Sequence, residues 1–221
     1  MNIWDKILFR LEQEKILKLV PIESEWLESR LIDYLQGREL EDVLSSNNCS
    51  LEKLQNDLLL PEALSRYAKF LFNPSIDESF LASKGAHDQV VYSILRVRDR
   101  GLSQELWIRL EESENTFAEI ATTFGEGPEA SHKGIIGPMS MGSITPPVIA
   151  NRLRTLRPGQ IHPPIQIGEW YVLLRLEKLV PARLDSSMKQ FLLDQQLNSL
   201  LQDRVSSMMS GTRPSDLDPY I

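Results

Sequence analysis

Apolar residues recur at three- and four-residue spacing through the first 84 positions, and each set occupies one face of a helix. The sets are Ile3, Ile7 and Leu11, then Leu27, Leu31 and Leu35, then Leu51, Leu54 and Leu58, and last Leu64, Ala68 and Leu71. Proline lacks a backbone N–H, so Pro61 is expected to open the last of these helices and Asn73-Pro74 to end it. Ser75 and Glu78 then have the spacing of a capping box that starts another helix.

The pattern changes after Gly85. The run Gln89–Val97 is rich in β-branched and aromatic residues, which is typical of a strand, and Thr116 with Glu119 predicts a second capped helix. The expected order is a strand at 89–97, helices around 102–110 and 117–124, a short strand at 134–137, a helix around 149–156, and strands at 165–167 and 170–176 joined by a tight turn. This order favours a small, mostly antiparallel sheet covered by helices.

A further apolar stripe lies near the C-terminus. Asp185 is suited to cap a helix, and the apolar positions on one face of that helix are Leu193, Leu197, Leu201, Val205 and Met208. Such a helix needs a partner surface. The N-terminal helices are the expected one, and a partner protein or a second copy of the chain is the alternative. The tail from Gly211 is expected to be frayed.

These patterns together predict an α+β protein in three parts. Residues 1–84 form an N-terminal helical domain, and residues 85–181 form a domain built on the small antiparallel sheet. Residues 182–221 form the long C-terminal helix, which packs on the N-terminal helices, and its frayed tail.

Composition and charge narrow the classes of function. The 221 residues are 42% hydrophobic and 25% charged, with a net charge of −7, as in ordinary soluble proteins. Arg152, Arg154 and Arg157 form only a small basic patch, so nucleic-acid binding is not expected. No apolar run approaches the length that spans a bilayer, and the N-terminus has no signal-peptide core. We therefore expect a cytoplasmic protein without a membrane span.

The residues that most often bind metals are few and scattered. The single cysteine, Cys49, lies in a polar run and is interpreted as a loop thiol, and His87, His132 and His162 share no paired spacing. We expect no metal and no cofactor.

Several short motifs resemble the parvulin family of peptidyl-prolyl isomerases (rotamases). Phe117-Ala118-Glu119-Ile120-Ala121 is similar to the family's Phe-Ala-x-x-Ala helix, and Gly134-Ile135-Ile136-Gly137 stands where the family has Gly-Asp-Leu-Gly. Leu156–Ile161 resembles the Leu-x-x-Gly-Glu-Val turn, and Pro164-Ile165 with Trp170–Arg175 resembles the closing hairpin. The flanking helices resemble SurA-type chaperones, and the Gly-Glu-Trp-Tyr-Val strand resembles PpiC-type proteins of cyanobacteria. The resemblance implies a parvulin-like sheet domain and polypeptide clients that contain proline.

The resemblance also implies a site. The three apolar positions of the family's proline pocket fall on Ile136, Ile144 and Val148, and the alternative is that these residues are ordinary core. Two of the polar positions fall on Ser93 and Tyr171. The third, often Cys or Asp in the family, falls on Gly127, and the neighbouring Glu126 is taken as its acidic residue, so the expected polar set is Ser93, Glu126 and Tyr171. The family has histidines at the first and last of these, so the catalytic network is degenerate.

Three functions remain open at this point. The first is a parvulin-type isomerase that stabilises a twisted Xaa-Pro amide without covalent chemistry. The second is a catalytically degenerate chaperone that binds client segments. The third is a structural adaptor that docks a partner through the C-terminal helix.

Overall fold

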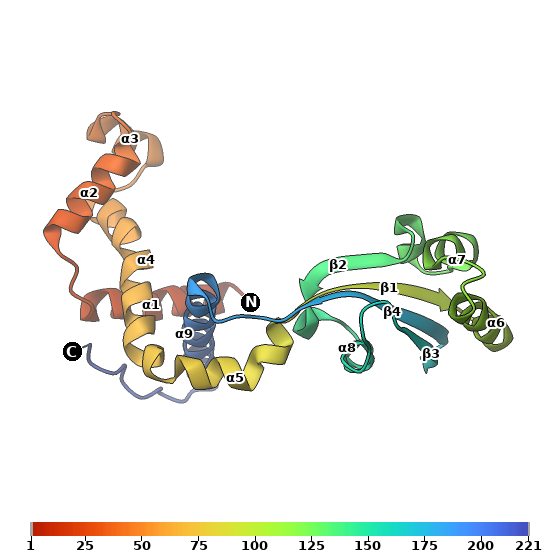
Figure 1. The fold of residues 1–221 in the computed structure, drawn as a ribbon. Helices are drawn as coiled ribbons and strands as arrows, with labels where there is room; N and C mark the ends of the chain where they lie inside the picture. The colour runs from red at the N-terminus through yellow and green to blue at the C-terminus, as the bar shows by residue number, and fades with distance from the viewer. Residues whose placement is uncertain (1, 221) are drawn as a thin grey trace. The chain divides into compact units, whose positions relative to one another are not determined.

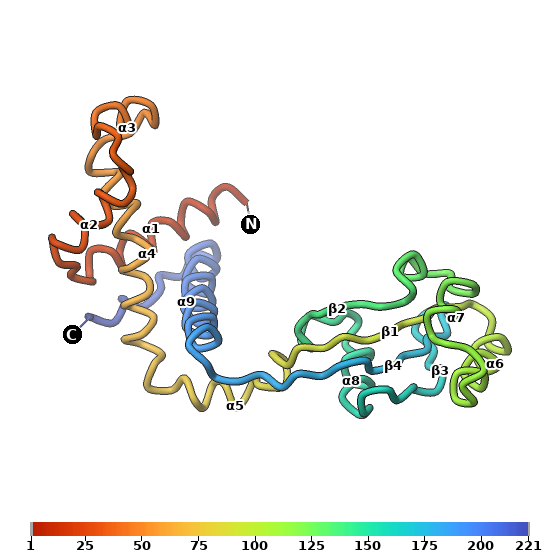
Figure 2. The backbone as a smooth tube through the Cα atoms, turned by 45° about the horizontal axis from the view of Figure 1, so that its top comes forward, coloured from red at the N-terminus to blue at the C-terminus, as the bar shows by residue number. Residues whose placement is uncertain are grey.

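A computed structural model describes residues 2–220. By the clustering of contacts the chain divides into two compact units, one formed by residues 1–80 with 184–221 and the other by residues 81–183. We call the first the helical unit and the second the sheet unit, and each is described by itself. Figures 1 and 2 show the helices of the first and the sheet of the second.

The helical unit joins the N-terminal third of the chain to its last helix. Its elements are α1 (Ile3–Leu19), α2 (Ser24–Leu35), α3 (Leu40–Asn47), α4 (Leu51–Phe72), the first part of α5 (Ile76–His87) and α9 (Ser186–Met209). Helices α1, α4 and α9 pack against one another, and Ile16, Tyr67 and Leu201 are fully buried where they do so. The apolar stripe of α9 therefore lies against the N-terminal helices.

One expectation about helix boundaries in this unit is wrong, and another is confirmed. Pro61 lies inside α4 and does not open a new helix. Burial of Leu60, Ala63 and Tyr67 on one face of α4 outweighs the loss of one backbone hydrogen bond at the proline. Helix α5 begins at Ile76, as the spacing of Ser75 and Glu78 indicates, and the Ser75 hydroxyl donates to the carbonyl of Phe72.

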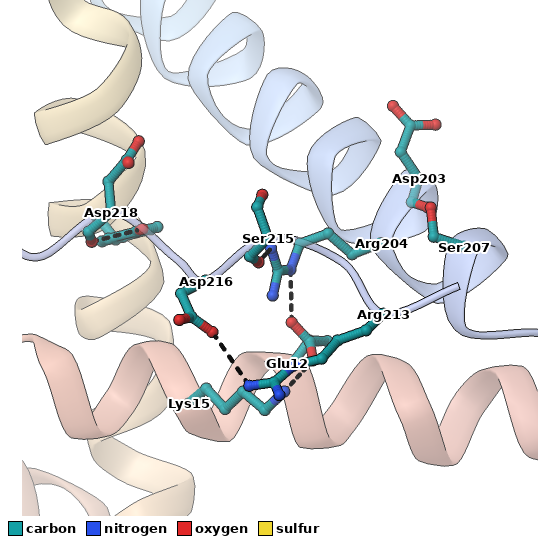
Figure 3. A network of polar contacts seen from close by, with 10 residues as sticks. Glu12, Lys15, Asp203, Arg204, Ser207, Arg213, Ser215, Asp216 and Asp218 are labelled. Atoms are coloured by element: carbon teal, nitrogen blue, oxygen red, sulfur yellow. Dashed lines mark hydrogen bonds and ion pairs between the residues drawn. The ribbon is translucent and has the colours of Figure 1, made fainter. Parts of the chain in front are cut away.

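The segment after α9 is not frayed, contrary to expectation. Figure 3 shows it crossing the helical unit beside a network of charged side chains. Arg204 of α9 donates from Nη1 to the carbonyl of Ser215 at 2.6 Å, and the hydroxyl of Tyr67 donates to the carbonyl of Asp218 at 2.9 Å. The ring of Tyr220 lies 5.2 Å from that of Phe70. These contacts hold the tail, which the sequence pattern alone did not indicate.

The charged network is centred on Glu12 of α1. Its side chain is 1% exposed and accepts from Arg204 Nε at 2.6 Å and from Lys15 Nζ at 2.5 Å (Figure 3). Burial raises the pKa of Glu12, but the hydrogen bonds from Lys15 and Arg204 outweigh it, and the pKa lies below its ordinary value. Glu12 is therefore a buried carboxylate held in its charged form.

The sheet unit contains one antiparallel sheet with the strand order β2-β1-β4-β3. The strands are β1 (Gln89–Val97), β2 (Ile135–Ser140), β3 (Ile161–Ile167) and β4 (Trp170–Val180). The helices are α6 (Arg100–Glu111), α7 (Phe117–Phe124) and α8 (Pro147–Leu153). The predicted class, an α+β protein with a small antiparallel sheet, N-terminal helices and a long C-terminal helix, is confirmed.

Local signals explain most of these boundaries. Thr116 and Glu119 form the expected capping box at the start of α7, and Asp185 caps α9 by accepting from the N–H of Met188. Strands β2, β3 and β4 extend beyond the expected ranges because their outer residues pair with a neighbouring strand. Short runs that contain prolines, such as Pro163-Pro164 in β3, hide this pairing from a sequence pattern.

Two apolar layers lie on opposite faces of the sheet, because alternate residues of a strand point to opposite sides. On the first face, residues of β1 and β4 pack with α8: Tyr92, Ile94, Ile149, Leu153, Val172 and Leu174. On the second face, they pack with α6 and α7: Leu95, Val97, Leu106, Phe117, Ile120 and Leu173. We call these the α8 face and the α7 face. No described helix has the length and apolar character needed to span a membrane.

Candidate functional site

A small cavity of about 60 Å³ opens on the α8 face of the sheet. Its walls come from β1, β3, β4 and the start of α8. They are Ile94, Arg96, Thr145, Pro146, Ile149, Ile167, Trp170 and Val172. Since a single water occupies about 10–15 Å³ by such a measure, the cavity has room for a group of several heavy atoms. Six of these eight lining residues are apolar, and Arg96 is the charged one.

Arg96 lies beside a buried acid. Its Nε lies 3.0 Å from Oε1 of Glu129, whose side chain is 5% exposed, while the Arg96 side chain is 34% exposed. The direction of this contact does not meet hydrogen-bond geometry. Neither Arg96 Nε nor either carboxylate oxygen of Glu129 has a hydrogen-bonding partner among residues 2–220. The carboxylate also lies close to the Cα of Gly127, where an added Cβ would come within 2.3 Å of it.

Tyr92 lies on the same face of β1 as Arg96. Burial is the main cause that raises the pKa of its hydroxyl, the charge of Arg96 lowers it and that of Glu129 raises it. The net pKa lies above the ordinary value. Tyr92 is therefore a neutral phenol near the ion pair at ordinary pH.

Trp170 forms one wall of the cavity and is supported from outside. The guanidinium carbon of Arg98 lies 4.7 Å from the centre of the Trp170 ring, a cation–π contact. Arg98 also lies 3.9 Å from Glu169 at the hairpin turn. The ring is thereby fixed as a flat surface beside the opening.

Two of the three predicted pocket residues lie in the apolar layer of the α8 face, and the third is exposed. Ile136 is half-buried opposite Tyr92, and Ile144 is buried, so both belong to the apolar layer of the α8 face. Val148 is 37% exposed and points away from that layer. Its neighbour Ile149 lines the cavity instead, because Ile149, Ala150 and Leu153 form the buried side of α8.

Ser93 lies on the α7 face, away from the cavity. It is 1% exposed, and its hydroxyl donates to Oε1 of Glu177, which also accepts from Arg175 Nε at 2.7 Å. Arg175 lies 5.5 Å above the ring of Phe117. Ser93 therefore belongs to a satisfied network on the opposite side of the sheet from Ile144.

The structure does not bring Ser93, Glu126 and Tyr171 together. Tyr171 shares the α7 face with Ser93 but is opposite Val97, four residues along β1, or about 13 Å away at 3.3 Å per residue. Glu126 lies at the other edge of β1, where its Oε1 accepts from the N–H of Arg98 at 2.9 Å. The register between β1 and β4 decides this outcome, because it places Tyr171 opposite Val97 and not opposite Ser93. A shift by one residue would move the whole set to the other face.

Sequence reasoning missed the polar groups of the cavity region. Tyr92, Arg96 and Glu129 were not selected, although the period of two placed Tyr92, Ile94 and Arg96 on one face. Of the described residues that line the cavity, none is a histidine. Glu129 lies in a 3-10 turn (Pro128–His132) whose approach to β1 no pattern indicates.

A known family model matches most of the sheet unit. Residues 100–178 match the family model described as Rotamase, the PPIC-type PPIASE domain. The sheet unit has a parvulin-like fold. The match covers α6 through most of β4, and with them the helix, turn and hairpin motifs on which the resemblance rested. A comparison with curated protein sequences found no match.

The solved structures to which this chain is similar include two described as bacterial peptidylprolyl isomerases. The peptidylprolyl isomerase PrsA from Bacillus cereus has 17% sequence identity and a TM-score of 0.52, with 97% of this chain and 84% of that chain covered. PrsA from Bacillus anthracis has 14% identity and a TM-score of 0.49, covering 95% and 100%. At this identity the likeness shows the fold alone. The closer resemblance to PpiC-type proteins of cyanobacteria stays a prediction.

Proposed function

We propose that this protein is a parvulin-type peptidyl-prolyl cis-trans isomerase that acts on Xaa-Pro bonds of polypeptide clients. The observation that carries the proposal is the apolar cavity between the sheet and α8, which has a single charged side chain, Arg96, in its wall. The PPIC-type PPIASE match over residues 100–178 supports it.

The size and lining of the cavity suit a proline ring. The ring has five heavy atoms and no hydrogen-bond donor, so it gains free energy from apolar walls, at about 25 cal/mol per Å² removed from water. Ile94, Ile149 and Val172 supply aliphatic walls, and Trp170 supplies a flat aromatic one. The prolyl bond then lies at the mouth of the cavity, beside Arg96.

The reaction needs no bond to be broken. Rotation about the amide has a barrier of about 18–20 kcal/mol because twisting removes the resonance between nitrogen and carbonyl. A site that holds the ring, removes the amide from water and binds the twisted form more tightly than the planar form lowers this barrier. The sheet unit offers these elements without a covalent nucleophile.

The second candidate is a catalytically degenerate chaperone. Its supporting observation is that α1 carries apolar side chains on an exposed face of the helical unit: Ile3, Trp4, Ile7 and Leu11. The separation of Ser93, Glu126 and Tyr171 also favours it, because these three polar side chains do not converge on one point. In this case the cavity would still bind proline but would not accelerate rotation.

Exchange spectroscopy by NMR on short Xaa-Pro peptides separates the two candidates. The intact chain is expected to raise the cis-trans exchange rate in proportion to its concentration. Replacing Thr145, which is exposed at the cavity, by Trp closes the opening and abolishes the increase, while Trp at the exposed Ser143, outside the cavity lining, serves as the matched control. A rate equal to that of buffer, with peptide still bound, would leave only the chaperone.

The other expectations from the sequence remain proposals. We propose proline-containing polypeptides as clients, a cytoplasmic location, and the three-part division at residues 84 and 181. Cell fractionation tests the location, and limited proteolysis tests the boundaries. Association through α9, the adaptor alternative, is tested by sedimentation of the whole chain at high concentration.

A further inference from the structure

Two Arg–Glu pairs lie on opposite faces of the same sheet and differ in one respect. On the α7 face, the carboxylate of Glu177 accepts hydrogen bonds from both Arg175 and Ser93. On the α8 face, Arg96 and Glu129 are within 3.0 Å, but Arg96 Nε and the Glu129 oxygens form no hydrogen bond with any group of residues 2–220. The first pair is satisfied. The second pair lies beside the cavity that Arg96 lines, and it leaves buried donor and acceptor atoms without a hydrogen bond.

An arrangement of the second kind is poorly explained by stability. Burying a charged carboxylate is unfavourable unless its geometry and its hydrogen bonds are good. Buried polar groups that lack partners are uncommon in folded proteins and call for an explanation. The Glu129 carboxylate is more deeply buried than that of Glu177, at 5% against 24% exposure, so the less satisfied pair is also the more buried one.

We infer that Arg96 is a catalytic residue that donates a hydrogen bond to the prolyl nitrogen in the twisted state, and that Glu129 is a positioning residue that holds the guanidinium for it. The inference rests on the proposed isomerase function. It assigns roles to two side chains that lie outside the set predicted from sequence.

The chemistry gives this contact a preference for the transition state. In a planar amide the nitrogen lone pair is delocalised into the carbonyl and is a poor acceptor. At a twist of about 90° the lone pair is localised, and the nitrogen accepts a hydrogen bond. A donor at this position therefore binds the twisted form more tightly than either planar form, which is the condition for catalysis. No covalent bond is broken and no proton is transferred in this step.

Glu129 has a geometric role in this account. A guanidinium group has five N–H donors in a rigid plane, and the carboxylate of Glu129 forms an ion pair on the Nε side of Arg96. The terminal nitrogens are then left for the ligand. Because Glu129 is held against Gly127 and beside β1, it fixes the guanidinium without contacting the ligand itself.

Substitutions of the pair test the inference through kcat and KM of the whole chain, measured by NMR exchange. Arg96→Met keeps the aliphatic part of the side chain and is expected to lower kcat by about 10- to 100-fold with KM changed by less than about threefold, as for loss of one transition-state donor. Arg96→Lys is expected to restore only part of the loss, because an ammonium group lacks the planar fork. Arg175→Met on the other face is the matched control and is expected to keep the wild-type kcat.

A double-mutant cycle separates positioning from structure. Glu129→Gln is expected to lower kcat by about 3- to 10-fold, and Arg96→Met/Glu129→Gln is expected to match Arg96→Met alone, since Glu129 acts through Arg96. Equal melting temperatures confirm that folding is not the cause, and Glu129→Asp provides a second variant if the first does not fold. If the loss of kcat in the double variant equals the product of the two single losses, the positioning role of Glu129 is overturned.

Failure of this inference is distinct from failure of the proposed function. If the wild-type chain does not accelerate exchange, the isomerase proposal falls. The catalytic role of Arg96 is overturned, while the isomerase stands, if the wild-type chain is active and Arg96→Met keeps more than half of the wild-type kcat. A change in KM alone has the same meaning.

Discussion

Replacement of Glu12 by Gln tests how the helical unit is held together. The substitution keeps the shape of the side chain but removes its charge, so Arg204, whose side chain is 8% exposed, loses its buried counterion. Removing one partner of a buried pair costs about 3–5 kcal/mol. The amide oxygen of the substituted side chain can still accept one hydrogen bond, and the carbonyl of Ser215 still accepts another from Arg204. We therefore expect the lower end, about 3 kcal/mol.

Urea unfolding followed by circular dichroism measures this loss, and amide exchange in α1 localises it to the helical unit. With a slope of about 2 kcal/mol per molar, the midpoint is expected to fall by about 1.5 M. Glu14→Gln on the same helix removes an exposed partner of Arg10 and is the control, with an expected change below about 0.5 kcal/mol. A loss below about 1 kcal/mol for Glu12→Gln would refute the reasoning.

The same network predicts a pH dependence with a definite sign. The pKa of Glu12 is lower in the folded chain than its ordinary value of 4.5, because the hydrogen bonds from Lys15 and Arg204 outweigh the effect of burial. The stabilisation is therefore complete above the unfolded pKa and is lost as the pH falls through the folded pKa. Stability of Glu12→Gln should change less over that acidic range than stability of the wild type.

Three further outcomes follow from the contacts. Ser93→Ala should reduce the free energy of unfolding by about 1–2 kcal/mol, through loss of its bond to Glu177, without changing the exchange rate per folded molecule. Tyr67→Phe should leave α4 folded but expose the tail near Asp218 to limited proteolysis. Thr116→Ala should cost about 1 kcal/mol by removing the cap of α7, measured by thermal unfolding.

The fold was largely predictable because its elements carry local signals. The strand at 89–97 has the bounds the pattern predicts, and the helix that follows Thr116 begins where its capping box indicates. The continuity of α4 through Pro61 was not predictable, since it depends on burial against α1 and α9. The order of the tail likewise depends on Tyr67 and Arg204, which are far from it in sequence.

The candidate site was less predictable for a physical reason. Strand side chains alternate, so a choice of Ser93 in place of Tyr92 selects the wrong face of the sheet relative to Ile144. Helical periodicity similarly decides between Val148, which is exposed, and Ile149, which lines the cavity. Glu129 reaches Arg96 from a loop, and no spacing rule relates the two.

Intermolecular NOE spectroscopy tests the central claim most directly. With the intact chain and a short Xaa-Pro peptide, the ring protons of proline are expected to show contacts to the methyl groups of Ile94, Ile149 and Val172 and to the indole of Trp170. Contacts confined to other surfaces, such as α1 or the α7 face, would contradict the claim that the cavity beside Arg96 holds the prolyl ring.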